Sequence, residues 1–70
     1  MYIAFYLFYK PKKEFHKTLF AQWNDWNPLF TNTKAKAKRY TSEQEAQEDI
    51  DWLWKAVSNK AITLNIKVEK

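Results

Sequence analysis

Few side chains in this chain of 70 residues could perform catalysis. There is no cysteine and no glycine, which excludes thiol nucleophiles, thiolate metal sites and the glycine-rich loops that cradle phosphates. The single histidine, His16, would need a carboxylate such as Asp25 for acid–base chemistry, but no third polar group accompanies the pair. One histidine also cannot hold zinc, which needs about three or four ligands.

The remaining nucleophiles and paired carboxylates are explained by secondary structure. Ser42 stands where a helix is expected to begin, and Ser58 where it is expected to end. Asp49 and Asp51 lie two residues apart on that helix, so their carboxylates point to different sides and cannot act together. We therefore expect a protein that is not an enzyme and that holds no metal and no cofactor.

Large aromatic rings are unusually abundant, with four Trp, four Tyr and five Phe. A chain this short is expected to form one domain over residues 1–70, with marginal stability. Each ring can bury about 150–250 Å², so rings can substitute for core volume. The same residue types are favoured in interface hot spots. Composition therefore leaves room for partner binding or for a homodimer.

Charge is segregated along the chain, whose net charge is +4. Residues 1–40 carry eight Lys or Arg against two acids, whereas residues 41–60 carry two Lys against five acids. We therefore expect a basic side and an acidic helix end. A uniformly basic nucleic-acid binder would not need the acidic part.

The elements that must position these residues begin with a strand over residues 2–9, which are rich in aromatic side chains and end at a Lys-Pro breaker. Alternation makes both of its faces apolar. One face carries Ile3, Phe5, Leu7 and Tyr9, and the other carries Tyr2, Ala4, Tyr6 and Phe8. Such a strand lies in the middle of a covered sheet or has one face free for a ligand.

Residues 12–26 are predicted to form a short helix that ends before Asn27-Pro28. The large side chains of this segment recur at helical spacing, as Phe15, Leu19, Trp23 and Trp26. A helix followed by a turn at Asn24-Asp25 fits the same residues equally well.

The clearest helix start lies at residues 41–45, where Ser42 with Glu45, or Thr41 with Gln44, has the spacing of a capping box. The side chains expected on its buried stripe are Ala46, Ile50, Leu53 and Val57. Asn59 is expected to cap the C-terminal end in a chain without glycine.

Two further strands complete the expected fold. Residues 29–31 suit a short strand, and residues 62–69 alternate between apolar and polar side chains. The apolar residues expected to face inward in the last strand are Ile62, Leu64, Ile66 and Val68. The fold class is therefore α+β, with a three- to four-stranded antiparallel sheet, one long helix on a face and a short helix after the first strand.

The first candidate binding surface is aromatic. Its members are expected to be Trp52, Trp23, Trp26 and Tyr6. Trp52 lies off the buried stripe of the long helix, about 100° from Leu53, and Tyr6 faces away from that helix. Clustered exposed rings on a small protein indicate a docking surface for another protein. In the alternative interpretation, residues 12–26 fold over the second face of the sheet and bury these rings.

The second candidate surface is basic. It consists of Lys34, Lys36, Lys38 and Arg39, with Lys10, Lys12, Lys13 and Lys17 as further candidates. Residues 34–38 could be extended, which would place their three lysines on one face. A lysine ridge beside sheet tyrosines could bind single-stranded DNA or RNA, with phosphates on the ridge and bases on the rings. In the alternative interpretation, the ridge is a solvated hairpin that keeps the protein soluble.

The apolar start of the chain is too short to cross a bilayer, which takes roughly 20 residues, and it lacks the pattern of a signal peptide. We therefore expect a cytoplasmic protein with no membrane partner.

Residues 30–46, together with residues 62–69, resemble a pattern of small phage and mobile-element accessory proteins. In that pattern an aromatic-Thr start leads through Ala-Lys-Arg-aromatic into Thr-Ser-Glu at a helix start, and an alternating strand follows. The resemblance implies a non-enzymatic inhibitor or modulator of a host protein or nucleoprotein complex, of the anti-defence or anti-CRISPR kind. It would act in the cytoplasm of a bacterial host.

Overall fold

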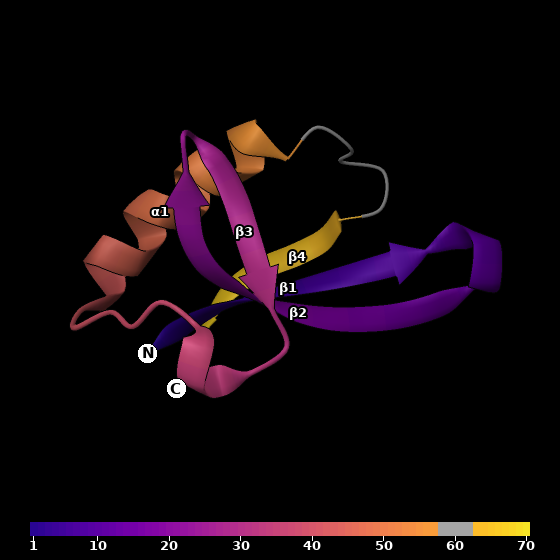
Figure 1. The fold of residues 1–70 in the computed structure, drawn as a ribbon, viewed down its shortest axis with the longest axis horizontal. Coiled ribbons are helices and arrows are strands. Elements are labelled where there is room, and N and C mark those ends of the chain that lie inside the picture. The colour runs from indigo at the N-terminus through magenta and orange to yellow at the C-terminus, as the bar shows by residue number, and fades with distance from the viewer. Residues whose placement is uncertain (58–62) are drawn as a thin grey trace.

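The computed structural model describes residues 1–57 and 63–70, and its centre is a four-stranded antiparallel sheet in the order β3-β2-β1-β4 (Figure 1). The elements in chain order are β1 (Tyr2–Tyr9), the 3-10 turn η1 (Lys10–Lys12), β2 (Glu14–Asn24), β3 (Asn27–Thr31), the 3-10 turn η2 (Lys34–Lys36), α1 (Glu43–Ala56) and β4 (Thr63–Glu69). The α+β class, with an antiparallel sheet and one long helix, is confirmed.

Helix α1 begins where the capping pattern predicted. The hydroxyl of Ser42 accepts a hydrogen bond of 3.3 Å from the backbone N–H of Glu45, which satisfies one of the free donors at the helix start. The hydroxyl of Thr41 donates to the Glu45 carboxylate, so that side chain is held in place as well. The helix ends at Ala56, and Val57 caps it with its backbone N–H on the carbonyl of Leu53, while Asn59, the predicted cap, lies outside the described residues.

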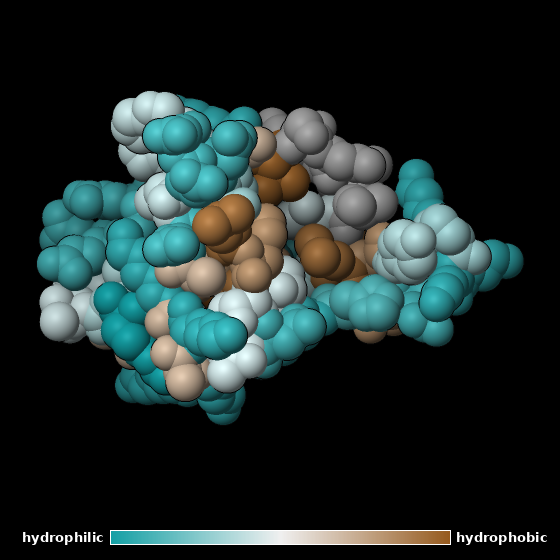
Figure 2. Space-filling view, viewed as in Figure 1, coloured by the Kyte–Doolittle hydropathy of each residue, from teal (hydrophilic) through white to brown (hydrophobic). Residues whose placement is uncertain are grey.

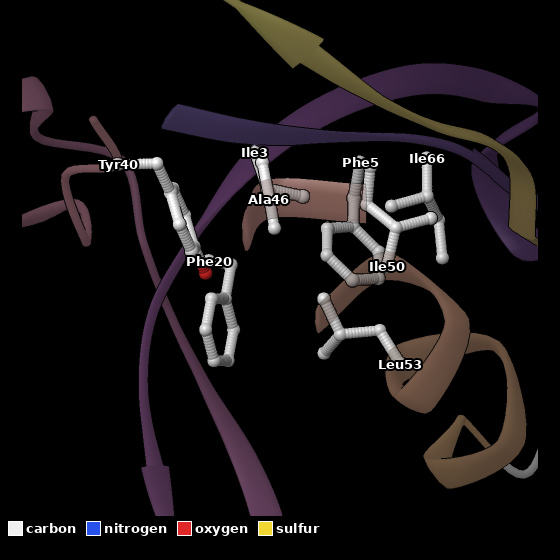
Figure 3. Close-up of a cluster of buried hydrophobic side chains, with 8 residues drawn as sticks. All are labelled: Ile3, Phe5, Phe20, Tyr40, Ala46, Ile50, Leu53 and Ile66. Carbon is white, nitrogen blue, oxygen red and sulfur yellow. The ribbon is translucent and has the colours of Figure 1, made fainter. Parts of the chain in front are cut away.

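The main core lies between the sheet and α1 (Figure 3). Its buried side chains come from β1, β2, β4, α1 and the segment before the helix, and they are Ile3, Phe5, Phe20, Tyr40, Ala46, Ile50, Leu53 and Ile66. The predicted helix stripe is thus buried as far as Leu53, while Val57 packs half-buried at the edge of the core.

A second, smaller core covers the other face of β1. It consists of Tyr2, Ala4, Leu19 and Ala37, with Tyr6 packed against it. Ala37 reaches this face because the η2 segment crosses it, and the backbone N–H of Lys38 donates to the carbonyl of Phe20. Both faces of the first strand are therefore covered near its start, which is one of the two arrangements that its apolar alternation allowed.

The helix expected over residues 12–26 is wrong, and so is the idea that this segment covers the second face. It forms β2 and the turn into β3, and it lies within the sheet. The spacing of Phe15, Leu19 and Trp23 is four residues each time, which is an even number. Such spacing places side chains on one face of a strand as well as on one face of a helix, so it cannot distinguish the two.

The inward pattern expected for the last strand is also wrong at one residue. Leu64 is 52% exposed, whereas its neighbour Thr63 is buried. Leu7 of β1 pairs with Thr63 and Tyr6 pairs with Asn65, so Leu64 is the extra residue of a β-bulge and turns outward. Ile62, expected at the start of this strand, lies outside the described residues.

The β1–β2 hairpin extends beyond the rest of the sheet as an arm (Figure 1). Among the described residues, β4 pairs with β1 only between Tyr2 and Leu7. Beyond that point the described residues of the arm form a two-stranded ribbon closed by η1. We call residues 8–16 the arm end.

Candidate partner-binding surfaces

Three of the four rings predicted to bind a partner come together in space. Trp23, Trp26 and Trp52 line one pocket of about 280 Å³, which Lys55 and Ala56 complete. The ring centres of Trp26 and Trp52 are 6.2 Å apart, and the two planes are tilted by 43°. Trp26 is 80% exposed and Trp52 is 56% exposed, so much of both rings faces solvent. We call this site the tryptophan pocket.

A bulge in β2 delivers Trp23 to this site. Phe20 pairs with Phe30 and Gln22 pairs with Leu29, which leaves Ala21 as an extra residue in β2. Phe20 and Trp23 are three residues apart and would face opposite sides of a regular strand. The bulge brings both to the helix side, where their ring centres lie 5.2 Å apart. Trp23 is therefore half-buried against the core and forms the fixed wall of the pocket.

The β2–β3 turn supplies Trp26 in an unusual backbone conformation. Asn24 pairs with Asn27, so the connection has two residues, and both have positive φ, 49° for Asp25 and 69° for Trp26. Turns of this kind match the twist of the strands but favour Gly at the second central position. A bulky residue held there costs on the order of 1–3 kcal/mol. Folding alone does not account for a mostly exposed Trp at a strained position.

Lys55 gives the tryptophan pocket a positive rim. It follows Trp52 by three residues on α1, and its Nζ lies 5.1 Å from the centre of the Trp52 ring. A lysine over an indole face is attracted by the ring quadrupole, and it remains available to a carboxylate. The pocket is therefore an apolar aromatic cleft with one cation at its edge.

Tyr6 lies apart from the tryptophan pocket, on the opposite face of the sheet. Its hydroxyl donates to Glu69, and this hydrogen bond raises the pKa of Tyr6. Lys17 lies 2.6 Å from the same carboxylate, which lowers the pKa of Glu69 and raises that of Lys17. The ammonium groups of Lys17 and Lys67 stand over the Tyr6 ring at 5.5 and 5.0 Å. Tyr6 is thus part of a polar cluster.

The four basic residues predicted to form a ridge do not share a face. Residues 34–36 form the η2 turn, so the extended alternation expected for them is wrong. Lys34 and Arg39 stand over the Tyr2 ring at 5.8 and 5.4 Å, while Lys36 lies beside β3. The segment is not extended because the guanidinium of Arg39 donates a hydrogen bond to the carbonyl of Lys34 and closes the segment on itself.

Lys38, the remaining member of the ridge, is tied to the helix. Its Nζ lies 2.9 Å from the carboxylate of Asp49, which also accepts a 2.6 Å hydrogen bond from the hydroxyl of Tyr40. Burial opposes ionisation of Asp49, but these two donors outweigh it, so the pKa of Asp49 is lowered. Burial and the bond to Asp49 raise the pKa of Tyr40 far above its usual value. Lys38 therefore has a structural partner.

Two negative findings concern the described residues only. Within residues 1–57 and 63–70, no group of three His, Asp or Glu side chains is placed to hold a metal ion. In the same part of the chain, no helix has the length and apolar character needed to cross a membrane.

Comparison of the chain with profiles of known protein families, with curated protein sequences and with solved structures found no match. The geometry of the chain itself is therefore the basis for assigning its function.

Sequence reasoning did not identify two features of these surfaces. It did not place Lys55 at the rim of the tryptophan pocket, although its spacing of three residues from Trp52 on a helix could have indicated this. The sequence also does not predict the arm end, because the spacing of large side chains over residues 12–26 indicates a helix. No local signal marks Ala21 as a bulge residue.

Proposed function

We propose that this chain is a non-enzymatic binding protein of the phage accessory kind, which inhibits or modulates a host protein or nucleoprotein complex by occupying one of its surfaces. It would do so in the cytoplasm of a bacterial host. The tryptophan pocket supplies most of the affinity, since Trp is the residue type most enriched in interface hot spots.

The observation that carries this proposal is the position of Trp26. The ring is 80% exposed and its backbone has a φ of 69°, so the residue contributes little burial and adds strain to the turn. Strained residues are retained where a function needs them. The ring stands beside Trp52, which is also largely exposed, so the two rings together offer a pre-formed apolar surface.

The partner that fits the pocket presents an apolar side chain next to a carboxylate. The three indole rings surround the apolar group, and the Lys55 ammonium lies at the rim for the acid. Binding needs little ordering, because Trp23 is packed against the core and the β2–β3 turn has only two residues.

Binding of single-stranded nucleic acid by the tyrosines of the sheet has less support. Tyr2 is buried, and two cations stand over its ring, so it offers no free face to a base. Tyr6 is half-buried between Lys17 and Lys67. Stacking of bases needs accessible aromatic faces.

The test is a pull-down of the tagged chain from bacterial lysate, with and without nuclease. Wild type is compared with Trp52→Ala and with Leu64→Ser, which changes an exposed apolar residue on β4 that does not line the pocket. We expect a discrete protein that survives nuclease treatment, is retained by Leu64→Ser and is lost with Trp52→Ala. The loss should correspond to about 2 kcal/mol or more, roughly thirtyfold in affinity.

Two outcomes would overturn the proposal. Capture that disappears entirely with nuclease would make the chain a nucleic-acid binder. Equal capture by wild type and by folded Trp52→Ala would remove the pocket from the interface. Circular dichroism of both variants shows that they are folded before either outcome is interpreted.

A further inference from the structure

The arm end is a narrow two-stranded ribbon that projects from the body of the protein (Figure 1). Phe8 pairs with Phe15 and Tyr9 pairs with Glu14, and η1 closes the ribbon. Pro11 fixes the backbone at the start of that turn, and Lys13 ends it in the left-handed conformation with a φ of 51°. The tip therefore has a defined shape.

Positive charge is concentrated at this tip, and Figure 2 shows that the far end of the arm is hydrophilic. Lys10, Lys12 and Lys13 are all exposed, and within the described residues none of them forms an ion pair. The nearest acid in the sequence, Glu14, is placed 3.3 Å from the imidazole of His16. The three ammonium groups are thus presented to solvent at the end of a ribbon.

Aromatic rings stand directly behind the lysines. Phe15 is 77% exposed, and its ring lies 5.1 Å from that of Phe8 on one face of the ribbon. Tyr9 packs edge-on against His16 on the other face, with ring centres 6.0 Å apart. Exposed rings at this place do not contribute to either core.

The ribbon face that carries Phe8 and Phe15 continues toward the body of the protein as a basic surface. Lys17 and Lys67 stand over Tyr6, two residues along β1 from Phe8, and Lys34 stands over Tyr2 farther in. The acidic helix α1 covers the opposite face, where it packs on Phe5. Cations therefore follow one another from the tip along one face of the sheet, with the Glu69 carboxylate paired to Lys17 among them.

We infer that the arm end binds duplex DNA, with the tip lysines on the phosphate backbone and the ribbon in the major groove. A two-stranded β-ribbon fits this groove, which is about 12 Å wide. Lys10, Lys12 and Lys13 would reach phosphates, while Phe15 could make the apolar contact that a thymine methyl group offers.

Two other polyanions fit the arm less well. A lipid surface would have to take up the lysines before the rings, because the three ammonium groups are farther out than Phe15. A single strand would need a series of stacking platforms, and behind Phe15 the next rings toward the body, those of Tyr6 and Tyr2, are covered by cations.

The inference goes beyond the proposed function and is tested without a protein partner. Fluorescence anisotropy measures the affinity of the purified chain for a labelled DNA duplex between about 50 and 200 mM salt. The variant Lys10→Gln/Lys12→Gln is compared with Lys36→Gln/Lys70→Gln, which removes the same charge outside the arm. Each pair lowers the net charge by two from +4.

We expect the arm pair to weaken duplex binding roughly ten- to a hundredfold at moderate salt and to reduce the slope of log affinity against log salt by about two. The control pair should keep the wild-type slope. Phe15→Ala should weaken binding with no change of slope, because the ring carries no charge.

Several results would overturn the inference. The first is no binding of the wild type to the duplex. The second is an equal reduction, in both double variants, of the slope of log affinity against log salt. The third is tighter binding to the single strand of the same sequence. Binding to vesicles of anionic lipid without binding to the duplex would also do so. None of them bears on the tryptophan pocket, since that site is not altered in these variants.

Discussion

Trp26 is the residue at which stability and function make opposite demands. Its ring is exposed and its backbone is left-handed, so a smaller or more flexible residue would fold at least as well. The preceding turn residue, Asp25, tolerates positive φ better because its short polar side chain can bond locally. The cost of the turn therefore falls mainly on Trp26, and the contact with Trp52 offsets only part of it.

The first prediction compares two replacements of the same ring. Trp26→Gly and Trp26→Ala both remove the contact with Trp52, but only glycine relieves the strain at positive φ. We expect the glycine variant to be more stable than the alanine variant by about 1 kcal/mol in chemical denaturation followed by circular dichroism. In a strand interior the order would be reversed, with glycine less stable by roughly 0.5–1 kcal/mol. The reversed order would show that Trp26 is not strained.

Among the elements, α1 and the segment before it are joined by one carboxylate. Asp49 accepts hydrogen bonds from Lys38 and Tyr40, and the ring of Tyr40 is part of the main core. This network fixes the path by which the chain passes from η2, on one face of the sheet, to α1 on the other.

The second prediction concerns the pH dependence of this link. The pKa of Asp49 is lower in the folded chain than in the unfolded chain. Its contribution is therefore fully present above the unfolded value of about 3.9 and is lost as pH falls through the lower folded value. Asp49→Asn should lower the free energy of unfolding by about 1–3 kcal/mol at neutral pH. The free energy of unfolding should also fall less steeply with decreasing pH in this variant than in the wild type.

The control for this prediction is Asp51→Asn. Asp51 lies on the same helix and accepts a 3.1 Å hydrogen bond from Gln47 in an exposed position. Its replacement should change stability by no more than about 0.5 kcal/mol. Equal effects of the two replacements would contradict the role assigned to the Asp49 network.

The elements differ in how far the sequence predicts them. The start of α1 and its stripe follow from local rules, because Ser42 caps its own helix and Ala46, Ile50 and Leu53 recur at one period. Strand β2 does not follow from local rules, since the even spacing of its large side chains fits a helix as well as a strand. The Ala21 bulge depends on the pairing of β2 with β3. Three of the four aromatic binding candidates nevertheless lie together, with Trp23 and Trp26 supplied by β2 and the β2–β3 turn instead of the expected short helix.

At the scale of the molecule, two candidate surfaces lie on different hairpins. The tryptophan pocket is built on the β2–β3 turn and the end of α1, and the basic arm end is built on the β1–β2 hairpin. The hairpins share β2 but extend in different directions (Figure 1). A partner that contains both protein and nucleic acid could therefore contact both surfaces at once.

Self-association is the competing use of the pocket, and the sheet edges argue against a dimer through strand pairing. The edge strand β3 contains Pro28, and the edge strand β4 is interrupted by the Leu64 bulge. We expect sedimentation velocity at a low and a high concentration to give the same monomer coefficient. A shift with concentration that Trp26→Gly removes would reassign the pocket to a dimer interface.

Capture of the nuclease-resistant partner by Trp26→Gly tests the role of the tryptophan pocket most directly. This variant relieves the turn and is expected to be fully folded, so loss of capture cannot come from loss of structure. We predict that it fails to retain the partner that wild type retains. Retention at wild-type affinity would contradict the claim that the exposed, strained Trp26 is kept for binding.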